Sequence, residues 1–78
     1  NLQQIVEKER LLVLLEEALS NLTPNQQECV SLFYLQKLSY QQISAKTGFE
    51  LLQVKSHIQN GKRNMRIFIE KKLKENEK

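Results

Sequence analysis

The chain has 78 residues, of which 12 are basic and 9 are acidic. A chain of this length forms one small domain, which buries only about 60% of the surface that its unfolded form exposes. Its single cysteine, Cys29, excludes an internal disulfide and disfavours a structural zinc site. No apolar run approaches the roughly 20 residues that span a bilayer, and no signal-peptide pattern is visible.

The composition favours an all-α fold. Glycine and proline are scarce, whereas Leu, Gln, Glu and Lys are abundant. The first residue is Asn1 rather than Met. We therefore expect residues 1–78 to form a single domain that is a fragment of a longer protein.

The first helix is expected over about residues 3–20. Its apolar residues recur at spacings of three to seven, which places them on one stripe. Leu11, Val13 and Leu14 widen this apolar surface. A face this wide is either buried on two sides, or buried on one side and used for docking on the other. The stripe itself consists of Ile5, Leu12, Leu15, Leu19 and Leu22.

A second helix is predicted to begin at Pro24, a residue that fits the first helical turn. Thr23 can cap its free amides, and Gln26, three residues later, completes the pattern of a capping box. We expect Cys29 to be a small buried apolar side chain and not a nucleophile, because no general base lies near it. The inward face is expected to contain Cys29, Val30, Phe33 and Tyr34.

The third predicted helix is only about two turns long. Ser39 is a good N-cap, and Gln42 makes a second capping box with it. Gly48 supplies the left-handed conformation with which helices commonly end. A short capped helix, a glycine turn and a following helix together outline a helix-turn-helix. We expect Tyr40 and Ile43 to face the core, with Ala45 as a further candidate.

The fourth helix is expected from Glu50 or Leu51 to about Lys74. At 100° per residue, one side forms a core stripe of Val54, Ile58, Gly61, Met65 and Phe68, close to Leu51. The opposite side combines amides, a hydroxyl and cations without carboxylates, which suits base edges and phosphates together. That side carries Leu52, Gln53, Ser56, Gln59, Asn60 and Arg63, flanked by Lys55, Lys62 and Arg66.

The charge distribution also points to this helix. Residues 1–52 contain four basic and six acidic side chains and have a net charge of −2. Residues 53–78 contain eight basic and three acidic side chains and have a net charge of +5. The positive charge therefore lies where a helix-turn-helix would meet phosphates.

From about Leu11 to Leu73 the chain resembles region four of bacterial sigma factors, specifically of the extracytoplasmic-function group. No single motif carries this resemblance, but the order and spacing of four segments together are fairly specific. These are Leu19–Pro24, the Leu-Phe-Tyr-Leu run before Leu38-Ser39-Tyr40, Gln42-Ile43-Ser44, and Gly48 followed by Val54-Lys55-Ser56.

The resemblance implies a helical domain that reads the minus-thirty-five promoter element and docks on the flap of the RNA polymerase β subunit. An anti-sigma factor is a further possible partner. By position, base-reading residues would be Gln53, Ser56, His57 and Asn60, with Leu51 and Leu52 at the groove entrance. Phosphates would be contacted by Lys55, Lys62 and Arg63, and by Ser39 and Tyr40 at the start of the third helix. Glu50 departs from the family, which usually has Ser or Thr before the recognition helix.

Two other readings stay open. The effector domains of LuxR-type regulators share the Leu22-Thr23-Pro24 start and a Val-Lys-x-His-x-x-Asn recognition helix, matched here by residues 54–60. They usually end that helix soon afterwards, whereas residues 62–74 here read as continuous helix. A helical protein-docking module without specific DNA binding is the other alternative.

An enzyme is the least supported class, because nucleophilic, metal-dependent and general acid-base schemes all lack parts. One histidine, one cysteine and no phosphate-binding glycine loop are present. We therefore expect no catalytic residue, metal, cofactor, small-molecule substrate or membrane partner. The expected location is the cytoplasm, in association with the nucleoid.

Overall fold

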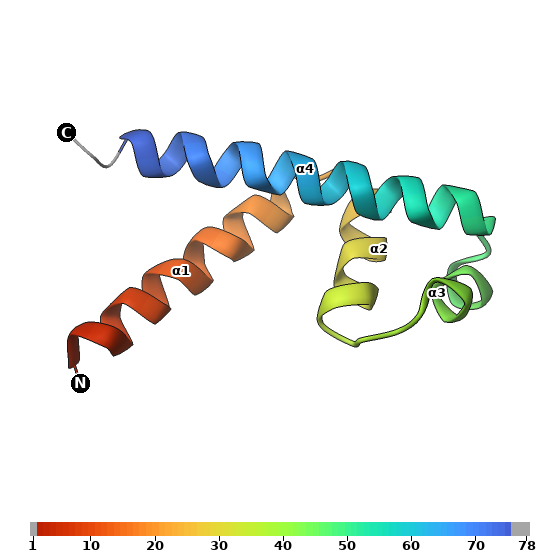
Figure 1. The fold of residues 1–78 in the computed structure, drawn as a ribbon, viewed down its shortest axis with the longest axis horizontal. Helices are drawn as coiled ribbons and strands as arrows, with labels where there is room; N and C mark the ends of the chain where they lie inside the picture. Colours follow the sequence, from red (N-terminus) through yellow and green to blue (C-terminus); the bar gives the residue numbers. More distant parts are fainter. Residues whose placement is uncertain (1, 76–78) are drawn as a thin grey trace.

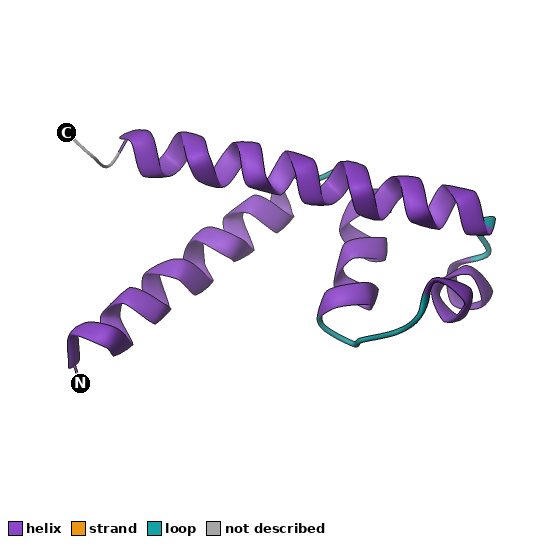
Figure 2. Cartoon of the chain, in the orientation of Figure 1, coloured by secondary structure: helices purple, strands orange, loops and turns teal. Residues whose placement is uncertain are grey.

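The computed structural model describes residues 2–75, and within them the chain folds into four α-helices. They are α1 (Leu2–Ser20), α2 (Pro24–Tyr34), α3 (Tyr40–Thr47) and α4 (Leu51–Glu75). This confirms the all-α class. α4 runs through Gly61 without a break for 25 residues, as expected from the sequence. Figure 2 shows helices joined by short loops throughout the described chain.

The helix ends follow from local capping. The Thr23 hydroxyl accepts a hydrogen bond from the Gln26 amide at 3.3 Å, and Pro24 occupies the first turn of α2. At α3 the capping box is complete: Gln42 N–H donates to the Ser39 hydroxyl, and Ser39 N–H donates to Gln42 Oε1. Each cap satisfies amides that a helix N-terminus leaves free.

The expected capping box of α2 forms only in part. The Thr23 half is present, but the Gln26 side chain does not return to the cap. Instead, Gln26 Oε1 accepts a hydrogen bond from Asn64 Nδ2 of α4 at 3.4 Å. The side chain thus joins two helices rather than closing one helix end.

The core lies where α2, α3 and the first half of α4 meet. Its buried side chains are Cys29, Leu32, Ile43, Val54 and Ile58, and around them pack Phe33, Leu38, Tyr40 and Phe49. Burial of this apolar surface is the main force that holds so short a helix as α3 in place. Cys29 is fully buried, as expected.

The α2–α4 crossing is unusually close at Gly61. An ideally placed Cβ on Gly61 would lie 2.6 Å from Val30 Cγ2 and 3.4 Å from Gln26 Cβ. Carbon atoms in contact are normally 3.5–4.0 Å apart. Glycine therefore lets α4 approach α2 more closely than any other residue would.

The molecule measures 43 × 25 × 14 Å along its principal axes, and Figure 1 views it along the shortest of them. Helices that diverge in this view therefore also diverge in space. The C-terminal end of α1 meets the middle of α4, and from there the two helices separate like the arms of a V (Figure 1). α2 and α3 lie along the other half of α4. Among the apolar side chains of residues 7–22, only Ala18 and Leu22, at the vertex, are buried.

Several expected core positions are wrong. Leu12 and Leu15 of the first stripe are exposed, because α1 leaves α4 before its apolar face is covered. Tyr34 is exposed at the end of α2, and Ala45 faces solvent. On α4, Val54, Ile58 and Gly61 are buried and Met65 and Phe68 are partly buried, but Leu51 is exposed at the first turn.

Candidate nucleic-acid interface

The turn between α3 and α4 is held by side-chain hydrogen bonds. Gly48 ends α3 with φ +84°, and its N–H donates to the Ser44 carbonyl oxygen. The Ser44 hydroxyl donates to the Phe49 carbonyl oxygen at 2.6 Å, and the Phe49 N–H donates to Thr47 Oγ1 at 3.2 Å. These bonds fix the direction in which α4 leaves the turn.

Gln53 takes part in the same turn. Its Oε1 accepts a hydrogen bond from the Glu50 N–H at 2.9 Å, which is one half of a capping box. Glu50 is a poor cap by its own side chain, and the bond that the structure shows is the reciprocal one, from the Glu50 N–H to the Gln53 side chain. The amide oxygen of Gln53 therefore points back to the turn, and its NH₂ group is the part left to donate outward.

The exposed face of α4 is free of carboxylates from Leu51 to Ile69. Of the twelve residues that the sequence predicts to contact DNA, nine lie exposed on this helix within its first sixteen residues. They are Leu52, Gln53, Lys55, Ser56, Gln59, Asn60, Lys62, Arg63 and Arg66. An ordinary solvated helix face mixes both signs of charge, whereas this one presents cations between amides and a hydroxyl.

The remaining three predicted residues are more constrained. The His57 ring is partly buried and lies 5.1 Å from the Phe49 ring, centroid to centroid. Tyr40 stacks on Phe33 at 5.1 Å and belongs to the rim of the core. Ser39 is exposed, but its hydroxyl and its N–H are both used in the α3 capping box.

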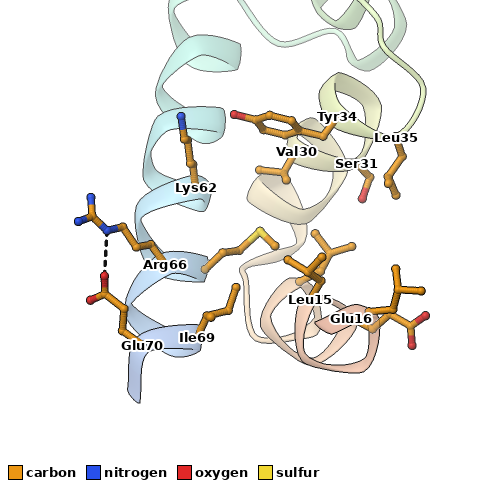
Figure 3. A pocket seen from close by; sticks show the side chains of 13 residues that line it. Leu15, Glu16, Val30, Ser31, Tyr34, Leu35, Lys62, Arg66, Ile69 and Glu70 are labelled. Carbon is orange, nitrogen blue, oxygen red and sulfur yellow. Dashed lines mark hydrogen bonds and ion pairs between the residues drawn. The ribbon is translucent and has the colours of Figure 1, made fainter. Parts of the chain in front are cut away.

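Lys62 and Arg66 differ from Lys55 and Arg63 in their surroundings. Both line an apolar groove between α1, α2 and α4, and Arg66 Nε pairs with Glu70 Oε1 at 3.1 Å (Figure 3). Both partners of this ion pair are largely exposed, so the pair contributes at most about 1 kcal/mol. Arg63 is exposed and is not among the groove-lining residues. Lys62 and Arg66 therefore lie on the groove side of α4, and Arg63 lies outside the groove.

The groove has a volume of about 810 Å³ and occupies the opening of the V. Figure 3 shows side chains from three helices pointing towards this space, with Tyr34 and Lys62 at one end and Ile69 at the other. Its apolar lining comes from Leu12, Leu15, Leu19, Val30, Tyr34, Leu35, Met65 and Ile69. The structure meets neither of the two outcomes expected for α1 in full, because among residues 7–20 only Ala18 is buried and Leu11, Leu12, Val13 and Leu15 are exposed.

Three contributors were missed by the sequence-based prediction. Asn64 links α4 to α2 through Gln26, Phe49 supports His57, and Ile69 lines the groove. The Phe49 contact could have been inferred, because Phe49 lies only two positions before the recognition helix. The other two depend on the angle between helices and leave no signal in the sequence.

Within the described residues, no helix has the length and apolar character needed to cross a membrane. Nor do three His, Cys, Asp or Glu side chains gather anywhere in residues 2–75 in a way that could hold a metal ion. Comparison with curated proteins and with solved structures found no match.

Comparison with protein families gives one clear result. Residues 12–65, more than half of the chain, match the family described as Sigma-70, region 4. The matched segment begins in α1 and ends in α4, so it contains the helix-turn-helix and most of the carboxylate-free face. This chain belongs to the sigma-70 region 4 family, the DNA-binding region of sigma factors.

Proposed function

We propose that this domain binds the minus-thirty-five promoter element, as one region of a longer sigma factor of the extracytoplasmic-function type. The observation that carries the proposal is the face of α4 after the turn, where exposed cations and amides follow one another without a carboxylate until Glu70. In a helix-turn-helix, the N-terminal residues of the second helix contact base edges in the major groove.

The proposal divides the work among the side chains. Lys55 and Arg63 contact phosphates and supply affinity on any sequence, because each neutralised phosphate releases counterions. Ser56, Gln59 and Asn60 contact base edges and supply discrimination of about 1–3 kcal/mol for each good pair. Gln53 donates from its NH₂ group, since its oxygen is held by the turn.

His57, Ser39 and Tyr40 act at the margin of this surface. The partly buried ring of His57, supported by Phe49, presents only its outer edge to DNA. Ser39 and Tyr40 lie at the start of α3, where the first helix of the motif passes the DNA backbone. Lys62 and Arg66 contribute positive potential from the groove side of α4.

The test of DNA binding is a titration of labelled duplex at several salt concentrations. Duplexes are first selected from a random pool at low salt, and one short, non-palindromic motif should be enriched. Arg63→Ala should lower affinity on all sequences alike and reduce the salt slope by about 0.9. Lys8→Ala, which removes the same charge from exposed α1, is the control and should change neither.

Asn60→Ala should relax the preference at one base pair and leave the salt slope unchanged. A two-fold symmetric motif would favour a dimeric regulator of the LuxR type instead. Retention without enrichment of any motif would refute sequence-specific binding by this domain and favour the docking module.

We further propose that the groove receives an apolar segment of the β-subunit flap of RNA polymerase core. Support comes from the exposed apolar side chains that line it, which the isolated domain leaves in contact with water. An anti-sigma factor that covers the same groove would then block recruitment. Leu12→Glu should weaken binding to core polymerase and preserve duplex binding, because Leu12 is exposed and lies away from the DNA face. Arg63→Ala should do the reverse.

A further inference from the structure

Leu52 is an apolar residue on a polar surface. It is 77% exposed, more than any other large apolar side chain of residues 7–75. It is the second residue of α4, and one turn further on the same side lie Lys55 and Ser56. Leu52 belongs neither to the core nor to the lining of the groove. Nothing in the packing of residues 7–75 therefore uses this side chain.

Comparison with the neighbouring Leu51 shows that the exposure of Leu52 depends on the direction in which its side chain points. Leu51 is 46% exposed, and it stands 100° further round the helix, nearer to the buried stripe of Val54 and Ile58. Leu52 points to the carboxylate-free side. It is held there by the turn, because the Glu50–Gln53 hydrogen bond fixes the first turn of the helix.

The major groove offers one apolar group to such a side chain. Each base pair presents hydrogen-bond donors and acceptors there, and only thymine adds a methyl group, at C5. Leucine has no polar atom in its side chain, so it cannot distinguish bases by hydrogen bonding. It gains by removing apolar surface from water, which happens when it contacts that methyl group.

We propose that Leu52 selects thymine at one position of the bound DNA, through contact with the C5-methyl group. This inference rests on the proposed binding of α4 in the major groove. Burial of one methyl-sized group corresponds to a change of about fourfold in affinity. The selected motif should therefore contain a thymine whose importance lies in its methyl group.

The test replaces each thymine of the selected duplex, one at a time, with deoxyuridine, which lacks only the methyl group. For the unchanged protein, one replacement should weaken binding about fourfold. For Leu52→Ala, the same replacement should have no effect. Leu11→Ala is the matched control, because Leu11 is 52% exposed and lies on α1, away from the start of α4 and outside the groove lining. It should keep the full deoxyuridine penalty.

Two results would overturn the inference. One is that no deoxyuridine weakens binding by the unchanged protein, and the other is that the penalty persists in Leu52→Ala. In both cases the selected motif and the effect of Arg63→Ala on the salt slope would remain, so the proposed function would stand. Failure to enrich any motif would remove both together. Circular dichroism should give the same unfolding midpoint for Leu52→Ala and Leu11→Ala, since both side chains are exposed.

Discussion

The close contact between α2 and α4 makes Gly61→Ala a sensitive probe of the structure. In an open helix this change would stabilise the chain by about 1 kcal/mol, because alanine has the higher helix propensity. Here the new methyl group would lie 2.6 Å from Val30 Cγ2, about 1 Å inside the normal contact distance. Overpacking of this kind costs about 1–3 kcal/mol. We expect a net loss of about 1 kcal/mol.

Val30 cannot easily move aside. Its side chain is only 4% exposed, and a β-branched residue in a helix has one strongly preferred rotamer. Gln26 Cβ and Leu22 Cδ1 close the space on the other sides, at 3.4 and 3.5 Å. The strain must therefore be relieved by separation of α2 from α4, which is the contact that positions the second half of the recognition helix.

The assay is urea unfolding followed by circular dichroism, for Gly61→Ala, Val30→Ala and the double variant. Without the Val30 Cγ2 atom, Gly61→Ala should stabilise the protein by about 1 kcal/mol through helix propensity alone. The effect of Gly61→Ala should thus differ by about 2 kcal/mol between the two backgrounds, within the range found for residues in contact. Equal stabilisation by Gly61→Ala in both backgrounds would refute the close approach.

Three further changes test the caps and the core. Ser39→Ala removes the hydroxyl of the α3 capping box and should lower the free energy of unfolding by about 1 kcal/mol. Gly48→Ala forces a side chain into a left-handed conformation and should cost about 1 kcal/mol, whereas Gly48→Asn should cost less in the same urea titration. Burial, and secondarily the Glu28 carboxylate, raises the pKa of the Cys29 thiol. The stabilisation from this shift is complete below the unfolded pKa of about 8.5 and is lost as pH rises through the folded pKa. Thermal midpoints should therefore fall more steeply above about pH 8 for the native chain than for Cys29→Ala.

The helix boundaries were predictable because local chemistry determines them. Thr23 with Pro24, Ser39 with Gln42, and Gly48 each satisfy or end a helix through residues within four positions. Such signals act before any tertiary contact forms, so the sequence contains them in full. The same reasoning identified the carboxylate-free face of α4, since 100° per residue is enough to place side chains around one helix.

What the sequence could not predict is where an apolar face meets a neighbour. The periodicity of α1 predicts that Leu12 and Leu15 face the core. They are exposed, because α1 and α4 diverge before these residues can contact α4. Tyr34 lies at the end of its helix in the same way, beyond the last neighbour on that side. Which of these residues are covered depends on the angles at which α1 and α2 cross α4. Those angles are determined by contacts elsewhere in the chain, at Gly61 and at Ala18 and Leu22 at the vertex.

The division of charge on α4 follows from the same geometry. Lys62 and Arg63 are adjacent in sequence and therefore point about 100° apart, one to the groove and one to the proposed DNA-binding face. A partner in the groove would cover the aliphatic stems of Lys62 and Arg66 without touching Arg63 or Lys55. The two surfaces thus share a helix but no side chain that both need for contact. Their coupling must then be electrostatic: an acidic occupant would reduce the positive potential that DNA meets, and an apolar one would leave it intact.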